Sequence, residues 1–290
     1  MQKSIKEAMM KFTDSHCHLD FAEFSSNLPE LLQQCQAKNI HRLIVPGVNP
    51  EHWQRVLSLV DLPKKNPDVN IQIACALGIH PWFLIVKNET ANTDLDFQTQ
   101  QLEQAINLNR NNLDAIGECG IDVFKAKKNT ASETALNDNI QLQQDFFEMQ
   151  LSLAKQNDLP VIVHHCQSHQ LIQPLLKKHK LAKAGVIHAF SGSYQQAKDY
   201  VDLGFKLGIG GTITYPRAKK TINAIKRLPL SSLLLETDAP AMPPSGQQGV
   251  SNTPVNLIPV FNALVAIRDE CAGVIAAQVE ANVDQLFFSA

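Results

Sequence analysis

Short apolar segments alternate with longer segments of helical periodicity along most of this 290-residue chain. Segments such as Ile40–Gly47 and Pro160–His164 are rich in β-branched residues and lack strict polar alternation, which is typical of strands buried in a parallel sheet. Between such segments, apolar residues recur three and four positions apart, as at Leu28, Leu31 and Leu32. The pattern therefore predicts a regular alternation of strands and helices.

Eight strands and nine helices are expected. The strands are Lys11–His18, Ile40–Gly47, Ile71–Gly78, Leu113–Glu118, Pro160–His164, Gly185–His188, Phe205–Ile209 and Leu233–Asp238. The helices are Leu28–Cys35, His52–Val60, Leu102–Asn109, Thr130–Gln156, Leu171–His179, Gln195–Leu203, Thr221–Arg227, Val255–Arg268 and Ala272–Phe288. Thr130 and Glu133 have the spacing of a capping box at the start of the fourth helix.

This order predicts an α/β fold, a (β/α)8 TIM barrel. A closed barrel is preferred to an open doubly wound sheet because no Gly-x-Gly-x-x-Gly follows the first strand. No linker interrupts the chain, so we expect a single domain over residues 1–290.

Composition narrows the class of protein. Hydrophobic residues at 44% and charged residues at 19% describe an ordinary globular chain. A net charge of -2 places any nucleic-acid contact at a local site rather than on a basic surface. The six cysteines are scattered, residues 1–7 lack the apolar core of a signal peptide, and no apolar run is long enough to span a membrane. We therefore expect a cytoplasmic protein, a monomer without an obligatory protein partner.

Two histidines near the N-terminus are the first candidates for chemistry. His16 and His18 are two positions apart in an expected strand, so both side chains project from one face. Imidazole nitrogens suit borderline divalent cations such as Zn²⁺ or Mn²⁺. Two half-buried histidines satisfied by hydrogen bonds are the alternative.

Further metal-ligating side chains fall at the carboxyl ends of other expected strands. The six candidates are His16, His18, Glu118, His164, His188 and Asp238. Active sites of TIM barrels lie at that face, so five strands could deliver these side chains to one mouth. Taken singly, Glu118 could be an exposed turn carboxylate and His188 a hydrogen-bonded core residue. The presence of six such side chains at the carboxyl ends of strands predicts a metal site.

The same residues lie in segments that resemble a known family. The segments are Asp14–Asp20, Gly78–Pro81, Ile116–Asp122, Leu159–His164, Gly185–Ser193 and Leu235–Pro240. In this order they are similar to the signatures of the TatD family, which are metal-dependent hydrolases of the amidohydrolase-like barrels, several of them deoxyribonucleases. The resemblance implies two divalent ions (Zn²⁺, Mg²⁺ or Mn²⁺) and DNA or another phosphate ester as substrate.

The resemblance also implies how the ligands divide. His16, His18, Glu118 and Asp238 would hold one ion, and Glu118, His164 and His188 would hold the other. Glu118 would belong to both sets and bridge the two ions.

Such a centre can activate a water and stabilise an in-line phosphoryl displacement. Asp238 would then be the natural proton acceptor, alongside Glu118 in the catalytic set. Glu236 shares the face of Asp238 and would support it from a deeper position. His80, at the end of the third strand, is expected to be an accessory group that touches substrate or a carboxylate.

One departure from the family pattern concerns substrate. After the fifth-strand histidine the family usually continues with a small residue and then Arg, whereas this chain has His165 and Cys166. An Arg would offer two donors to a phosphate, which a thiol cannot replace. His165 could act instead, or it could be a spare exposed histidine.

Candidate phosphate-binding cations follow the fourth and seventh strands. They are Lys125, Lys127, Lys128, Arg217, Lys219 and Lys220, of which Arg217 is the favoured substrate contact. Neither group is interleaved with aromatic residues in the sequence, and both could be solvated surface charges. Nuclease activity is therefore expected mainly from the resemblance.

Two other classes of function use the same ligands. An amidohydrolase, a lactonase or a small-molecule phosphoesterase would keep this metal centre, although dinuclear amidohydrolases often bridge through a carbamylated Lys where this chain has Glu118. The carboxylate favours phosphodiester cleavage. A non-enzymatic module that holds metal only for stability is the third class.

Overall fold

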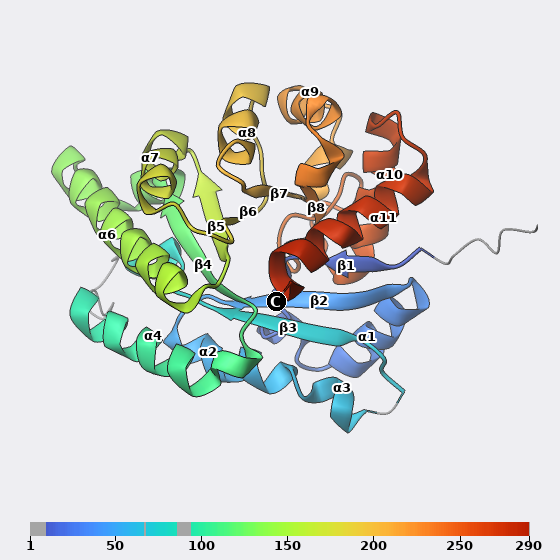
Figure 1. The fold of residues 1–290 in the computed structure, drawn as a ribbon, viewed down its shortest axis with the longest axis horizontal. Coiled ribbons are helices and arrows are strands. Elements are labelled where there is room, and N and C mark those ends of the chain that lie inside the picture. Colours follow the sequence, from blue (N-terminus) through green and yellow to red (C-terminus); the bar gives the residue numbers. More distant parts are fainter. Residues whose placement is uncertain (1–9, 67, 86–93, 290) are drawn as a thin grey trace, which may run out of the picture.

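The eight strands form one parallel sheet in sequence order (Figure 1). The structure is a computed structural model that describes residues 10–66, 68–85 and 94–289. The strands are β1 (Phe12–Asp14), β2 (Ile40–Gly47), β3 (Gln72–Leu77), β4 (Ala115–Asp122), β5 (Val161–Cys166), β6 (Gly185–Ile187), β7 (Lys206–Ile209) and β8 (Leu233–Leu235). Residues 1–7, in which we expected no signal peptide, lie outside the described ranges.

Backbone contacts between the first and last strands close the sheet into a barrel. The Ser15 N–H donates to the Leu235 carbonyl, and the Asp238 N–H donates to the His16 carbonyl, both at 2.9 Å. Cys17 and Ala239 continue this contact as an isolated parallel bridge. The expected TIM barrel is therefore confirmed.

Helices surround the sheet (Figure 1). They are α1 (Leu28–Ala37), α2 (Pro50–Leu59), α3 (Leu62–Lys65), α4 (Leu95–Asn109), α5 (Val123–Asn129), α6 (Glu133–Asn157), α7 (His169–His179), α8 (Tyr194–Val201), α9 (Lys219–Arg227), α10 (Leu257–Ile267) and α11 (Ala272–Val283). Within the described residues, none of these helices combines the length and the apolar character that a membrane span requires.

Several expected boundaries were wrong. β1 ends at Asp14 rather than at His18, because the backbone of residues 15 to 18 turns to bond with the chain that follows β8. β4 and β5 run beyond Glu118 and His164, since their ladder continues to the pairing of Asp122 with Cys166. Polar side chains expected at strand ends therefore lie inside these two strands.

The start of the longest helix also differs from expectation. α6 is capped by Ser132, whose hydroxyl accepts from the Ala135 N–H at 3.1 Å. Thr130 instead follows α5, a helix that the sequence pattern did not predict, and its N–H donates to the Ala126 carbonyl. The expected capping box at Thr130 was wrong because that residue ends one helix rather than starting the next.

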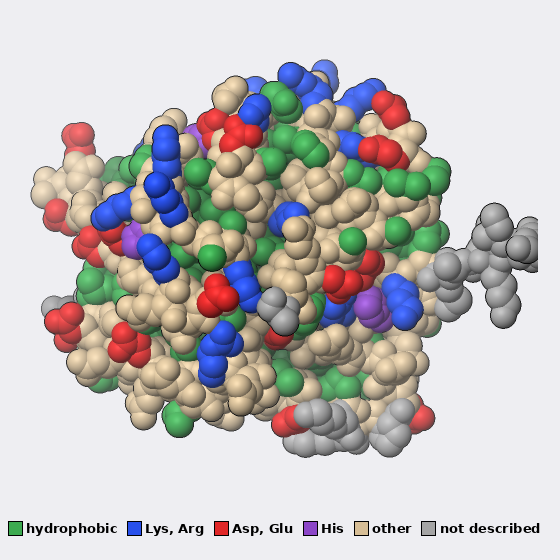
Figure 2. Space-filling view, viewed as in Figure 1, with side chains coloured by type: hydrophobic (Ala, Val, Ile, Leu, Met, Phe, Trp, Pro, Cys, Tyr) green, Lys and Arg blue, Asp and Glu red, His purple; other side chains and the backbone are tan. Residues whose placement is uncertain are grey.

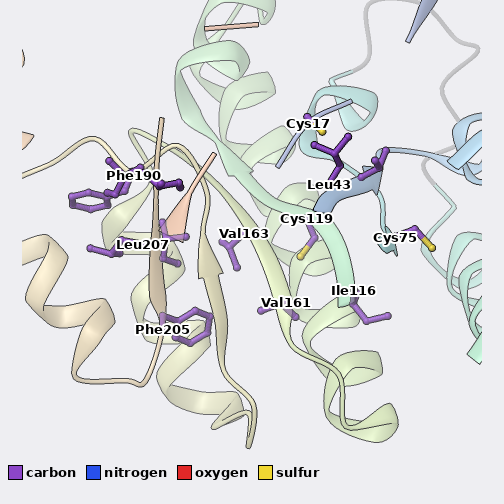
Figure 3. Close-up of a cluster of buried hydrophobic side chains, with 14 of the residues drawn as sticks. Cys17, Leu43, Cys75, Ile116, Cys119, Val161, Val163, Phe190, Phe205 and Leu207 are labelled. Atoms are coloured by element: carbon purple, nitrogen blue, oxygen red, sulfur yellow. The ribbon is translucent and has the colours of Figure 1, made fainter. Parts of the chain in front are cut away.

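Hydrophobic side chains form two layers around the strands. On β5, Val161 and Val163 belong to the large outer cluster between sheet and helices (Figure 3). Ile162 belongs to a smaller cluster inside the barrel. The C-terminal residues Leu286 and Phe287 pack into that inner cluster, and Figure 1 shows α11 crossing the barrel at this end. The inner core is thus sealed at one end, which leaves the opposite end for chemistry.

Candidate metal centre

Strand alternation delivers two of the candidate histidines to the barrel mouth. Ile162 and Val186 fill the barrel interior, and His164 and His188 follow each of them by two residues. Because residues two apart in a strand share a face, both imidazoles continue the interior surface toward the carboxyl ends of the strands.

Glu118 reaches the same surface through an irregularity in β4. Ala115 faces the interior, and the register with β5 shifts between Ile116 and Cys119. A β-bulge of this kind changes the alternation, so Glu118 points inward although it is three positions after Ala115. Gly117 is needed here, because it has a φ of +135° and a Cβ on it would lie 2.6 Å from the Ile162 carbonyl oxygen.

Four side chains converge on one point at the mouth. The Nε2 atoms of His16 and His18 are 3.2 Å apart, and they lie 3.2 Å and 3.5 Å from Glu118 Oε2. Asp238 Oδ1 is 3.7 Å from the first nitrogen and 3.5 Å from the second. Ligand atoms about 2.0–2.2 Å from one tetrahedrally coordinated ion are about 3.3–3.6 Å from one another. The donor atoms of this first set therefore fit one divalent cation.

The second oxygen of Glu118 faces another group of histidines. Glu118 Oε1 lies 2.9 Å from His164 Nδ1 and 3.6 Å from His188 Nε2. The other nitrogen of each ring is held by a carboxylate, His164 Nε2 by Asp122 at 3.2 Å and His188 Nδ1 by Glu236 at 3.1 Å. A carboxylate behind a histidine fixes its tautomer and presents the opposite lone pair, as in many metal sites. Glu118 Oε1, His164 and His188 are thus the donors on this side of the carboxylate, and a compact donor group formed by Glu118 and His164 also includes His80.

His80 lies equally close to Glu118 but has a different hydrogen-bonding state. Its Nε2 is 3.1 Å from Glu118 Oε1, and its Nδ1 accepts the Trp82 backbone N–H at 3.1 Å. Because Nδ1 is an acceptor, the proton of the neutral ring is on Nε2. His80 therefore donates to Glu118, which suits the accessory role expected for it rather than that of a metal ligand.

The charges at the mouth favour a cation between the carboxylates. Burial raises the pKa of Glu118, but His80, His16 and His188 outweigh it and hold this pKa well below its usual range. Burial lowers the pKa of His188, but Glu236, Asp238 and Glu118 raise it to about 10. The carboxylates thus stabilise positive charge among them.

Asp122 is a site residue to which the sequence analysis gave no role. Besides facing His164, its Oδ2 accepts from Trp82 Nε1 at 2.7 Å, and its backbone N–H donates to Gln143 at 2.8 Å. The sequence spacing could have identified Asp122, because it is four positions after Glu118 and residues an even number apart in a strand lie on one face.

Two buried glutamines of α6 support the mouth from behind. Gln143 holds Asp122, and Gln150 binds the Ile79 backbone, accepting at 2.7 Å and donating at 3.0 Å. Leu142 and Met149, two of the apolar residues that recur at helical spacing in this segment, are only partly buried. Helical periodicity finds apolar stripes, so it missed these polar positions.

Two expected substrate contacts lie away from the donor atoms. His165 is on the outer side of β5, where its ring packs against Tyr200 of α8 and His169 of α7. Arg217 stands over the Tyr215 ring at 4.6 Å, in a cleft of about 370 Å³ that also includes Met242. The structure does not bring His165 to the centre, and it places Arg217 beside the mouth.

Comparisons with known proteins agree with this fold. Residues 13–288 match the family model described as TatD related DNase. The chain is 41% identical over 278 residues to the uncharacterized metal-dependent hydrolase YjjV of Escherichia coli, covering 96% of this chain and 98% of the relative. An uncharacterized metal-dependent hydrolase of Haemophilus influenzae is 38% identical, with 96% and 100% covered.

Solved structures give the same result. The crystal structure of YjjV, a TatD homolog from Escherichia coli, superposes with a TM-score of 0.83 at 39% identity, covering 97% of this chain and all of that one. A TatD family hydrolase from Entamoeba histolytica shares the fold, with a TM-score of 0.79 at 17% identity over 97% and 99% of the two chains. On these grounds, this chain belongs to the TatD-related DNase family.

Proposed function

We propose that this protein is a divalent-metal-dependent hydrolase that cleaves phosphodiester bonds of DNA. The observation that carries the proposal is the position of Glu118, whose two carboxylate oxygens face two separate groups of histidines. A carboxylate placed in this way can bridge two ions. His16, His18 and Asp238 would complete one site, and His164 and His188 the other.

The comparisons support the class of reaction. Relatives about two-fifths identical are named metal-dependent hydrolases, and the matching family model is described as a DNase. Two adjacent divalent ions would supply an activated water and stabilise charge on phosphoryl oxygens. The identity of the ions, whether zinc, magnesium or manganese, belongs to this proposal.

The side chains at the mouth have distinct roles in it. Asp238 accepts the proton of the attacking water, since it is the most exposed carboxylate of the donor set, at 13% against 2% for Glu118. Burial raises the pKa of Asp238, but His188, His18 and His16 hold it below its usual range, so the group is ionised at neutral pH. Glu236 orients His188 and stabilises a proton on its Nδ1.

A small phosphate ester is the second candidate substrate. The net charge is -2, and a protein without net positive charge gains little from the charge of a long polymer. Figure 2 shows basic and acidic side chains interspersed at the end of the barrel that α11 crosses, which is opposite the mouth.

The test is a comparison of three substrates. Protein stripped of metal and then supplied with Zn²⁺, Mg²⁺ or Mn²⁺ is assayed on DNA, a phosphomonoester and a lactone. We expect metal-dependent cleavage of DNA to be fastest, and Asp238→Asn to lose activity on DNA while keeping bound metal in part. Faster turnover of the monoester or the lactone would reject DNA as the substrate.

A further inference from the structure

An exposed tryptophan stands directly beside the candidate metal centre. Trp82 follows His80 in the short helix Pro81–Leu84, and 49% of it is exposed. Its ring centroid is 6.2 Å from that of His164, and its Nε1 donates at 2.7 Å to the Asp122 oxygen that also faces His164. The indole is therefore fixed at the mouth while much of its surface remains free.

A cation accompanies this indole. Lys125, in the first turn of α5, places its Nζ 4.2 Å from the centroid of the Trp82 ring. Asp122 caps the same helix by accepting the Lys125 N–H at 2.7 Å, so a single carboxylate positions both members of the pair. Among the described residues, Lys125 forms no salt bridge. Its charge is available to a ligand.

The fold creates this pair from separate parts of the chain. The lysines after β4 have no aromatic interleaving in the sequence, yet Trp82 from the preceding loop lies under Lys125. Phe83 and Phe124, next in sequence to each member, are 41% and 52% exposed. The lack of aromatic interleaving in the sequence therefore does not exclude an aromatic neighbour, because the one that Lys125 contacts comes from another loop.

The chemistry of the pair matches a nucleotide. A base presents a flat π-face, which stacks on an indole, and the adjoining phosphate attracts an ammonium. The hydrogen bond to Asp122 fixes the indole in advance, which lowers the entropy lost on stacking. The lysine stem is flexible enough to move its ammonium from the ring to a neighbouring phosphate.

We propose that Trp82 and Lys125 form a subsite for the nucleotide next to the scissile phosphodiester, with its base on the indole and its phosphate at the ammonium. This inference rests on the proposed function and adds how the substrate is held. It assigns to Lys125 the phosphate contact that the thiol of Cys166 cannot make.

Binding can be measured without turnover. The chain has two tryptophans, and the other one, Trp53, is only 6% exposed and donates to the Gly78 carbonyl at 2.9 Å. In the metal-loaded full-length protein, a phosphorothioate-linked thymidine strand of about eight nucleotides should quench the fluorescence of Trp82. Trp82→Ala should weaken binding of the labelled strand about five- to a hundredfold, the scale of one base stack.

Two further variants separate stacking from structure. Trp82→Phe keeps a ring but lacks the donor to Asp122, so it should keep most of the affinity. Lys125→Met should reduce the slope of log Kd against log salt by about 0.7, the value for one phosphate contact on a single strand. Lys38→Met, an equal charge change at the exposed end of α1, should leave that slope unchanged.

An abasic nucleotide provides the decisive comparison. Moving one abasic position along the strand should reveal a place where wild-type protein loses as much affinity as Trp82→Ala does, and where the variant loses nothing further. The subsite is rejected if wild type and Trp82→Ala bind all strands with equal affinity. It is also rejected if Trp82→Phe binds as weakly as Trp82→Ala. Failure of the proposed function is distinct, because no strand would then be cleaved in a metal-dependent manner even by wild type.

Discussion

Asp14 and Thr237 are 223 positions apart in sequence and form two buried hydrogen bonds. Asp14 Oδ2 accepts from the Thr237 hydroxyl at 2.5 Å, and Oδ1 accepts from the Thr237 N–H at 2.9 Å. The same Oδ1 accepts from the His16 N–H at 3.2 Å. One buried carboxylate thus ties together the backbone that carries His16 and Asp238.

The first prediction concerns this closure of the barrel. Thr237→Val keeps the shape of the side chain but removes the hydroxyl donor, which leaves Asp14 Oδ2 buried without a partner. The expected loss is about 1–3 kcal/mol in the free energy of unfolding. Denaturant unfolding measures it, and Thr237→Ser, which keeps the hydroxyl, serves as the control. Equal stability of the Val and Ser variants would show that this bond contributes nothing.

The second prediction concerns metal content. Elemental analysis of gently purified protein should give close to two divalent ions per chain, because the two oxygens of Glu118 face different histidines, Oε2 facing His16 and His18 and Oε1 facing His164 and His188. His16→Ala and His188→Ala should each lower metal uptake by stripped protein. His179→Gln is the control, since His179 pairs with Glu148 at 3.1 Å on an outer helix. The ligand assignment is rejected if both site variants take up as much metal as the control.

The third prediction concerns the bridge. Glu118→Gln preserves the size of the side chain but has no negative charge to share between two cations, so the protein should fold and bind metal more weakly. Glu118→Ala should lose metal and activity together. Metal titrations of both variants, with circular dichroism to monitor folding, check this. Wild-type activity in either variant is incompatible with bridging.

The fourth prediction concerns Cys166. Its backbone pairs with Asp122 in the β4–β5 ladder, so a side chain at this position reaches the mouth near His164. Cys166→Arg should raise kcat/KM on a phosphate ester or a DNA end by about ten- to a hundredfold, the effect of a charged hydrogen bond of about 1.5–3 kcal/mol. Metal stoichiometry should not change.

Cys166→Met, similar in length but uncharged, controls for bulk in that comparison. The competing effect is a contact between the new guanidinium and Asp122, which would weaken the bond from Trp82. Thermal stability measured on the same preparations detects it. A stable Cys166→Arg protein without any gain on phosphate substrates would show that this position does not contact the substrate phosphate.

The fifth prediction concerns thiol reactivity. Cys271 is exposed at the N-cap position of α11, Cys166 is partly buried, and Cys17, Cys35, Cys75 and Cys119 are buried. Burial raises the pKa of the Cys35 and Cys75 thiols to about 12, and burial together with Asp122 does the same for Cys166, so these groups hold almost no thiolate at pH 8. A disulfide reagent should therefore label one thiol rapidly in the folded protein, and Cys271→Ser should abolish that phase. Rapid labelling of several thiols would contradict the buried positions of the others.

Local patterns in the sequence were sufficient to predict the order of strands and helices. Hydrophobic periodicity depends on which face of an element is buried, and a barrel repeats the same burial eight times. His164 and His188 were predicted at the mouth because each falls at the carboxyl end of an expected strand, and in the structure each follows an inward-facing residue by two positions. These features need no knowledge of the neighbouring strand.

The tertiary structure decided whatever depends on two segments at once. Glu118 points inward because the register of β4 shifts against β5, and alternation alone would have placed Gly117 there. Lys125 lies on Trp82 because of a contact across elements that no single periodicity contains, whereas His165 faces the helices by the same alternation that points His164 inward. Asp14 meets Thr237 only when the last strand reaches the first. The sequence by itself thus determined the strand order and the residue types at the mouth, while barrel closure and strand register determined which atoms face one another.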